Sequence, residues 1–155
     1  MPITSVTEGL VQGRTLIAPE LFDRLVHRVV AEHPDLGDGL PQRILDQALA
    51  FLGTSATATQ PLGPSELVDI GWHTFILHTV DYAAFCERVA GRFIHHVPDD
   101  DQGGTPPTIP TTLADTVTAI RAAGFALDAD LWPRAADCSS KCTQCHAGCT
   151  DSPTR

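Results

Sequence analysis

Apolar residues recur at helical spacing along most of this chain, and their pattern predicts five helices. Steps of three and four residues between apolar positions mark one face of each segment. Pro19 and Pro41 are favoured first residues of a helix, and Ser65 is a favoured N-cap. Thr112 and Asp115 form a capping-box pattern for the last helix. The predicted helices span about residues 19–32, 41–53, 66–78, 79–96 and 112–124.

The same pattern predicts an all-α fold, because no segment alternates between apolar and polar residues at a period of two. We expect a small bundle of about five helices with a flexible Cys-rich C-terminal tail. The predicted parts are a loose N-terminal segment at 1–17, a helical domain at 18–133 and the tail at 134–155. Residues 98–110 contain three successive aspartates and four prolines, which predict an irregular acidic loop.

Charge and composition exclude several classes of function. The chain of 155 residues carries 19 acidic against 10 basic residues, and its net charge is −9. Nucleic acid and anionic lipid both require a basic surface, so we expect neither as a partner. No run of about 18 apolar residues predicts a membrane span, and the first residues lack the features of a signal peptide. We therefore expect a cytoplasmic protein with reduced thiols.

The tail is unusually rich in cysteine, and we predict that it binds a soft metal. Four of the five cysteines of the chain lie there, and a histidine follows the third. Small polar neighbours offer these thiols no core to join. Thiolates suit Zn²⁺, Cu(I) or an Fe–S cluster. The candidate ligands of the tail are Cys138, Cys142, Cys145, His146 and Cys149.

Other chemistry fits the same tail residues. Cys142, Cys145 and His146 match the C-x-x-C-H pattern of haem c attachment, but we do not expect haem without an export signal. Spacings of three and four residues also permit disulfides, so the tail is a candidate thiol switch. A folded domain before a short Cys/Ser/Thr-rich end is also the layout of ribosomally made precursor peptides. In that case the partner is a modifying enzyme.

A second group of candidate metal ligands lies in the middle of the chain. Asp69 and His73 are four residues apart, so they share one face of a helix. Cys86 lies on the next predicted helix, which His95 and His96 close. Such residues on two adjacent antiparallel helices can converge on one Zn-type site.

These central residues also have a purely structural interpretation. Asp69 and His73 can form a hydrogen bond within one helix, and Cys86 shares the apolar face of Tyr82 and can belong to the core. His95 and His96, like any imidazolium pair at a helix C-terminus, would interact favourably with the helix dipole.

The central block also resembles a known group of proteins. Residues 69–98 contain the patterns D-x-x-W-H-x-F-I-L, Y-x-x-F-C and G-x-F-I-H-H-x-P. They resemble bacterial uncharacterised proteins labelled glycine-rich domain-containing protein-like, although this chain has no glycine-rich region. The resemblance implies a helical domain without an established activity, and it supplies no reaction.

The motifs favour a non-enzymatic protein. The chain has no phosphate-binding loop, no G-x-S-x-G and no H-E-x-x-H. Metal-assisted hydrolysis becomes conceivable only if the central residues converge with an open coordination position. Our leading hypothesis is a small helical protein with a metal-binding or thiol-switching tail and a possible second site at the central cluster. A protein-interaction adaptor that uses the acidic helical surface is a further hypothesis.

Overall fold

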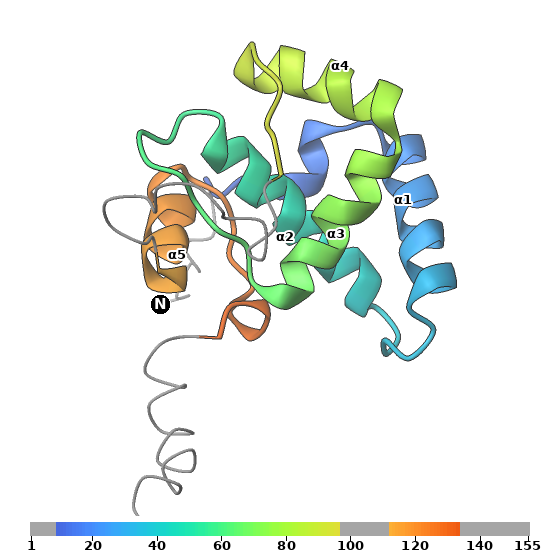
Figure 1. The fold of residues 1–155 in the computed structure, drawn as a ribbon. Coiled ribbons are helices and arrows are strands. Elements are labelled where there is room, and N and C mark those ends of the chain that lie inside the picture. The colour runs from blue at the N-terminus through green and yellow to red at the C-terminus, as the bar shows by residue number, and fades with distance from the viewer. Residues whose placement is uncertain (1–8, 97–111, 134–155) are drawn as a thin grey trace, which may run out of the picture.

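A computed structural model describes residues 9–96 and 112–133, and within these ranges the fold is all-α (Figure 1). The predicted fold class is confirmed for the described residues. The predicted acidic loop at 98–110 and the tail at 134–155 lie outside them. No helix of the described ranges is long and apolar enough to cross a membrane. The elements are η1 (Gly13–Leu16), α1 (Pro19–Glu32), α2 (Leu40–Ser55), α3 (Glu66–Leu77), α4 (Thr79–Ala90), α5 (Leu113–Ala122) and η3 (Ala129–Leu131).

The helices begin at the capping signals of the sequence. The Ser65 hydroxyl accepts a hydrogen bond of 3.2 Å from the backbone N–H of Val68 at the start of α3. Thr112 and Asp115 form the predicted capping box at the start of α5. In it, the Thr112 hydroxyl accepts from the Asp115 N–H at 3.1 Å, and the Asp115 carboxylate accepts from the Thr112 N–H at 2.9 Å. These bonds satisfy backbone donors that a helix start leaves unpaired.

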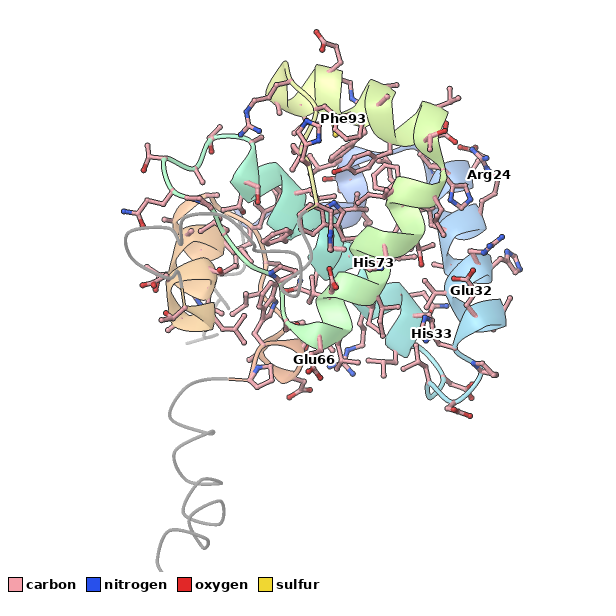
Figure 2. The ribbon with its side chains drawn as sticks, in the orientation of Figure 1. Arg24, Glu32, His33, Glu66, His73 and Phe93 are labelled. Atoms are coloured by element: carbon pink, nitrogen blue, oxygen red, sulfur yellow. The ribbon has the colours of Figure 1, made fainter. Side chains whose placement is uncertain are left out.

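Helix α4 ends earlier than the sequence pattern predicts. Gly91 adopts the left-handed conformation with φ of 67°, which terminates the helix after Ala90. The expectation that His95 and His96 close this helix is therefore wrong. Phe93, which follows the helix end, is 44% exposed and lies beside α4 (Figure 2). The segment after Gly91 instead turns back across the bundle (Figure 1).

Helix α2 is the centre of the fold and contacts η1, α1, α3 and α5. Its buried residues lie on nearly all sides of the helix, as expected for a helix enclosed by its neighbours. Helix α3 approaches α2 closely at Gly71. A Cβ atom at this glycine would lie 2.9 Å from the Ala48 Cβ and 3.2 Å from the Ile44 Cγ2. The absence of a side chain at Gly71 thus sets the distance between the two helices.

The end of the predicted loose segment, by contrast, packs against α2. A Cβ atom at the buried Gly13 would lie 2.6 Å from the backbone nitrogen of Ala50, so η1 touches the backbone of α2. The Arg14 N–H donates to the Asp46 carboxylate at 2.9 Å. Val11 donates from its N–H to the Gly124 carbonyl at 2.9 Å. These contacts are non-local, and no periodic pattern in the sequence indicates them.

The segment after α5 is fixed to α2 through one buried polar side chain. The Gln47 amide group donates to the Ala126 carbonyl at 3.0 Å. Its oxygen accepts from the Asp128 N–H at 3.0 Å and from the Trp132 indole N–H at 2.8 Å. Arg43 adds a two-point ion pair with Asp128, with bonds of 2.6 and 2.8 Å. The C-terminal part of the described domain is therefore held by hydrogen bonds as well as by the buried Trp132 ring.

Candidate metal site

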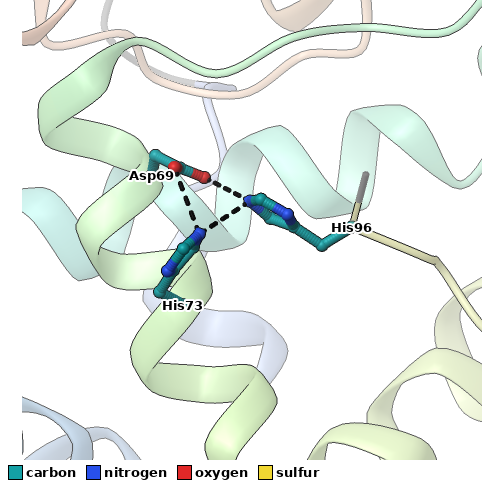
Figure 3. Close-up of side chains that lie close together, drawn as sticks. All are labelled: Asp69, His73 and His96. Atoms are coloured by element: carbon teal, nitrogen blue, oxygen red, sulfur yellow. Dashed lines mark hydrogen bonds and ion pairs between the residues drawn. The ribbon is translucent and has the colours of Figure 1, made fainter. Parts of the chain in front are cut away.

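Asp69, His73 and His96 meet at one point of the structure (Figure 3). Asp69 and His73 lie one turn apart on α3, and His96 lies on the segment that returns from α4. The His96 Nε2 atom is 2.7 Å from the Asp69 Oδ1 atom, and the His73 Nε2 atom is 3.3 Å from the Asp69 Oδ2 atom. The two Nε2 atoms are 3.0 Å apart. One carboxylate and two imidazoles thus present three potential ligand atoms to a common centre.

Hydrogen bonds alone do not give the Asp69 carboxylate and both Nε2 atoms favourable partners. An ionised carboxylate only accepts hydrogen bonds, so an Nε2 atom that faces Asp69 must carry hydrogen to pair with it. If His73 and His96 both do so, two N–H groups face each other across 3.0 Å. If only one does, its N–H can also donate to the Nε2 atom of the other ring at 3.0 Å, but the lone pair of that second atom then faces the carboxylate. A cation between the three groups would accept a lone pair from each of them.

The site is sheltered on one side and open on the other. The His96 side chain is only 13% exposed, and its ring packs against the Trp72 indole with centroids 4.4 Å apart. The His73 side chain is 59% exposed. A groove of about 260 Å³ lies on this open side, and its lining in the described part of the chain is His73, Ile76, Leu77 and His96.

The returning segment is anchored at Ile94, two residues before His96. The Tyr82 hydroxyl donates a hydrogen bond of 2.6 Å to the Ile94 carbonyl and accepts one of 2.9 Å from the Trp72 indole N–H. The Ile94 N–H points to the Cys86 sulfur at 3.5 Å. Both polar backbone groups of this buried residue therefore contact side chains of α4. Burial raises the pKa of the Tyr82 hydroxyl well above its usual range, so the hydroxyl keeps its proton and remains a donor.

The structure brings together three of the five central candidates. Cys86 is 1% exposed and lies in the core, where its sulfur contacts the Ile94 backbone rather than the three potential ligands. His95 is exposed, and its ring lies against Phe93 with centroids 4.8 Å apart. The other predicted site, formed by Cys138, Cys142, Cys145, His146 and Cys149, lies outside the described residues.

Sequence reasoning placed Tyr82 on an apolar face and missed the polar contacts of Trp72 and Tyr82. Both residues are buried, and the indole N–H and the hydroxyl form a chain of hydrogen bonds that ends at the Ile94 carbonyl. The residue types could have predicted these contacts, because a buried Trp or Tyr usually needs a hydrogen-bond partner for its N–H or O–H group. These two residues position His96 rather than bind a ligand themselves.

Comparison with protein families gives one finding for this region. The family model described as UCP032817-like matches residues 13–103, which is more than half of the chain. The matched range contains Asp69, His73 and His96 together with Trp72 and Tyr82. No curated protein and no solved structure matches the chain.

Proposed function

The chain belongs to the UCP032817-like family, and we propose from the geometry of its His/Asp cluster that it is a metal-binding protein. In this proposal Asp69, His73 and His96 hold a divalent transition-metal ion, with Zn²⁺ as the first candidate. The supporting observation is that the two oxygens of one carboxylate and two imidazole nitrogens converge from two separate segments of the chain.

The donor set suits such an ion. Zn²⁺ binds imidazole nitrogen and carboxylate oxygen at roughly 2.0–2.2 Å, which places neighbouring ligand atoms of a tetrahedral site roughly 3.3 Å apart. Here the two Nε2 atoms are 3.0 Å apart, the His96 Nε2 atom is 2.7 Å from Asp69 Oδ1, and the His73 Nε2 atom is 3.3 Å from Asp69 Oδ2. Small side-chain rotations would bring one of these oxygens and both nitrogens to the spacing of such a site. Two histidines and one carboxylate also suit Fe²⁺, whereas Cu(I) and Fe–S clusters favour sulfur. We therefore propose Cu(I) or an Fe–S cluster only for the thiols of the tail.

A metal ion with an open coordination position could itself activate water, but we propose binding rather than catalysis as the role of this site, because the described lining supplies no second catalytic group. Among the described residues that line the adjoining groove, the titratable side chains are His73 and His96. Both are metal ligands in the proposal, so neither is left to act as a general base. The remaining lining residues, Ile76 and Leu77, carry no polar side-chain group.

We also propose that the chain is related to the glycine-rich domain-containing protein-like group. The three sequence patterns of that resemblance include Asp69, Trp72 and His73 from α3, Tyr82 and Cys86 from α4, and His96. Their side chains form the trio or anchor its third member, so one shared site would account for the whole set of patterns.

Metal titration of the full-length chain tests the proposal. The four tail cysteines are changed to serine in the background, so that the tail thiols do not contribute to binding. We expect one ion of Zn²⁺ or Co²⁺ per chain, and His96→Asn should lower the affinity more than about tenfold because it removes a ligand. His95→Asn is the matched control, since His95 is the neighbouring histidine outside the trio, and it should leave the affinity unchanged.

The proposal is contradicted if His96→Asn and Asp69→Asn both bind the ion as the parent does. Far-ultraviolet circular dichroism of each variant without metal excludes unfolding as the cause of lost binding. Asparagine is suitable for this purpose because it retains much of the shape and polarity of both side chains.

A further inference from the structure

Beside the proposed metal lies an apolar groove, and we infer that the two together bind a short aliphatic carboxylate. The carboxylate would bind the ion, and the alkyl chain would lie along Ile76 and Leu77. This inference rests on the proposed function, because it requires the metal at Asp69, His73 and His96.

An open coordination position supports the inference. Three protein ligands leave a tetrahedral ion with one position for water or for an outside ligand. The more sheltered imidazole of the trio is His96, at 13% exposure, whereas the His73 side chain is 59% exposed. The open position therefore faces the side on which the groove lies, since both imidazoles line it.

The charge of the site favours an anion. A divalent cation together with the Asp69 carboxylate and two neutral imidazoles has a net charge of +1. This local charge contrasts with the chain as a whole, whose net charge of −9 disfavours anions at most of its surface. A monocarboxylate would neutralise the site on binding.

The groove limits the size and polarity of the rest of the ligand. Its volume of about 260 Å³ lies below the roughly 300–1,000 Å³ of pockets for drug-sized molecules, so a short chain fits best. Ile76 and Leu77 form its apolar wall, and Leu77 is 62% exposed without such a ligand. An alkyl chain would remove part of this apolar surface from water.

A chain-length series tests the inference. The probe protein is the full chain with serine at the four tail cysteines, loaded with Co²⁺, whose visible absorption reports its ligands. Acetate, butyrate and hexanoate are added in turn. Burial of each further methylene group favours binding, and in a half-open groove the affinity should rise about twofold per methylene.

Leu77→Ser should flatten this dependence on chain length without changing Co²⁺ affinity. Val80→Ser is the matched control, because Val80 is another exposed aliphatic residue, at 82% exposure, and does not line the groove. If Co²⁺ binds but no carboxylate alters its spectrum, or if acetate and hexanoate bind equally well, the inference is overturned and the proposed function stands. If Co²⁺ does not bind, both are overturned.

Discussion

The Tyr82 hydroxyl donates a hydrogen bond of 2.6 Å to the backbone carbonyl of Ile94 and so joins α4 to the segment that carries His96. The same hydroxyl accepts from the Trp72 indole, at 2.9 Å, which adds α3 to the connection. Trp72 in turn lies next to His73 in the sequence and packs against the His96 ring. The segment that carries the His96 imidazole is therefore anchored by the buried hydroxyl of Tyr82.

Removal of this hydroxyl by Tyr82→Phe should weaken the metal site without destroying the fold. The change leaves the Trp72 N–H and the Ile94 carbonyl without a buried partner, which costs about 1–3 kcal/mol of unfolding free energy. Because the segment at Ile94 positions His96, we expect Zn²⁺ affinity to fall about tenfold, the lower end of the range for residues that orient metal ligands. Urea denaturation and metal titration measure the two effects.

Thr116→Val is the control for Tyr82→Phe. Thr116 is a fully buried residue of α5, and its hydroxyl donates to the Gly63 carbonyl at 3.1 Å. Its replacement by the similarly shaped valine should also cost stability, by roughly 1–3 kcal/mol, but should leave Zn²⁺ affinity unchanged. Equal losses of affinity in both variants would show that stability alone, and not the position of His96, controls binding.

A methyl group at Gly71 should disturb the helix that carries Asp69 and His73. In Gly71→Ala the new Cβ atom would lie 2.9 Å from the Ala48 Cβ, so α2 and α3 would have to move apart. Alanine favours a helix over glycine by about 1 kcal/mol, but overpacking of a core costs about 1–3 kcal/mol, so we expect a net loss of stability. Thermal denaturation measures it.

Gly37→Ala provides the comparison for Gly71→Ala. Nothing lies within 4 Å of a Cβ atom built at Gly37, so this change should be neutral or slightly stabilising. A stable Gly71→Ala protein with an unchanged melting temperature would contradict the tight packing of α2 against α3.

Local signals in the sequence predicted most of the helical fold. Pro19, Ser65 and the capping box at Thr112 and Asp115 each act within one helical turn, and the structure confirms all of them. The end of α4 was misjudged because the apolar spacing continues through Gly91, where the left-handed backbone stops the helix. Apolar periodicity reports side-chain positions and does not register a change in φ.

The candidate site was only partly predictable for a related reason. The Asp69–His73 pair follows from helical spacing, and the structure places the two groups 3.3 Å apart. The approach of His96, by contrast, depends on the turn at Gly91 and on the Tyr82 hydrogen bond. The first is a local backbone conformation and the second a tertiary contact, and no spacing rule within a single helix contains either.

The ion pair of Arg43 with Asp128 should make stability depend on pH. The hydrogen bond from Arg43 holds the pKa of the Asp128 carboxyl below its usual range. A lowered pKa in the folded state stabilises the protein above the unfolded-state pKa, near 4, and this contribution is lost as the pH falls through the folded-state value. Asp128→Asn should therefore lower the urea midpoint at pH 7, and its difference from the parent should shrink steadily below about pH 4.

Asp130→Asn is the control for this pH effect. Asp130 binds the same guanidinium at 2.9 Å, but its side chain is 83% exposed, against 25% for Asp128. Solvent screens such an exposed pair, so Asp130→Asn should change the urea midpoint less at every pH. A constant difference between Asp128→Asn and the parent from pH 7 to pH 3 would contradict the assigned role of the carboxylate charge.

The tail thiols require a separate test, because residues 134–155 lie outside the described structure. If Cys142 and Cys145 bind a soft metal, the full-length chain should bind more metal than the site at Asp69, His73 and His96 accounts for. The Cys142→Ser/Cys145→Ser variant should then lose only this excess, and unchanged stoichiometry would rule the tail out as a metal site. Mass spectrometry of the intact protein from its producing cell, under native and denaturing conditions, separates the alternatives. Mass lost on denaturation indicates bound metal, whereas a shift that persists and maps to residues 138–155 indicates the work of a modifying enzyme.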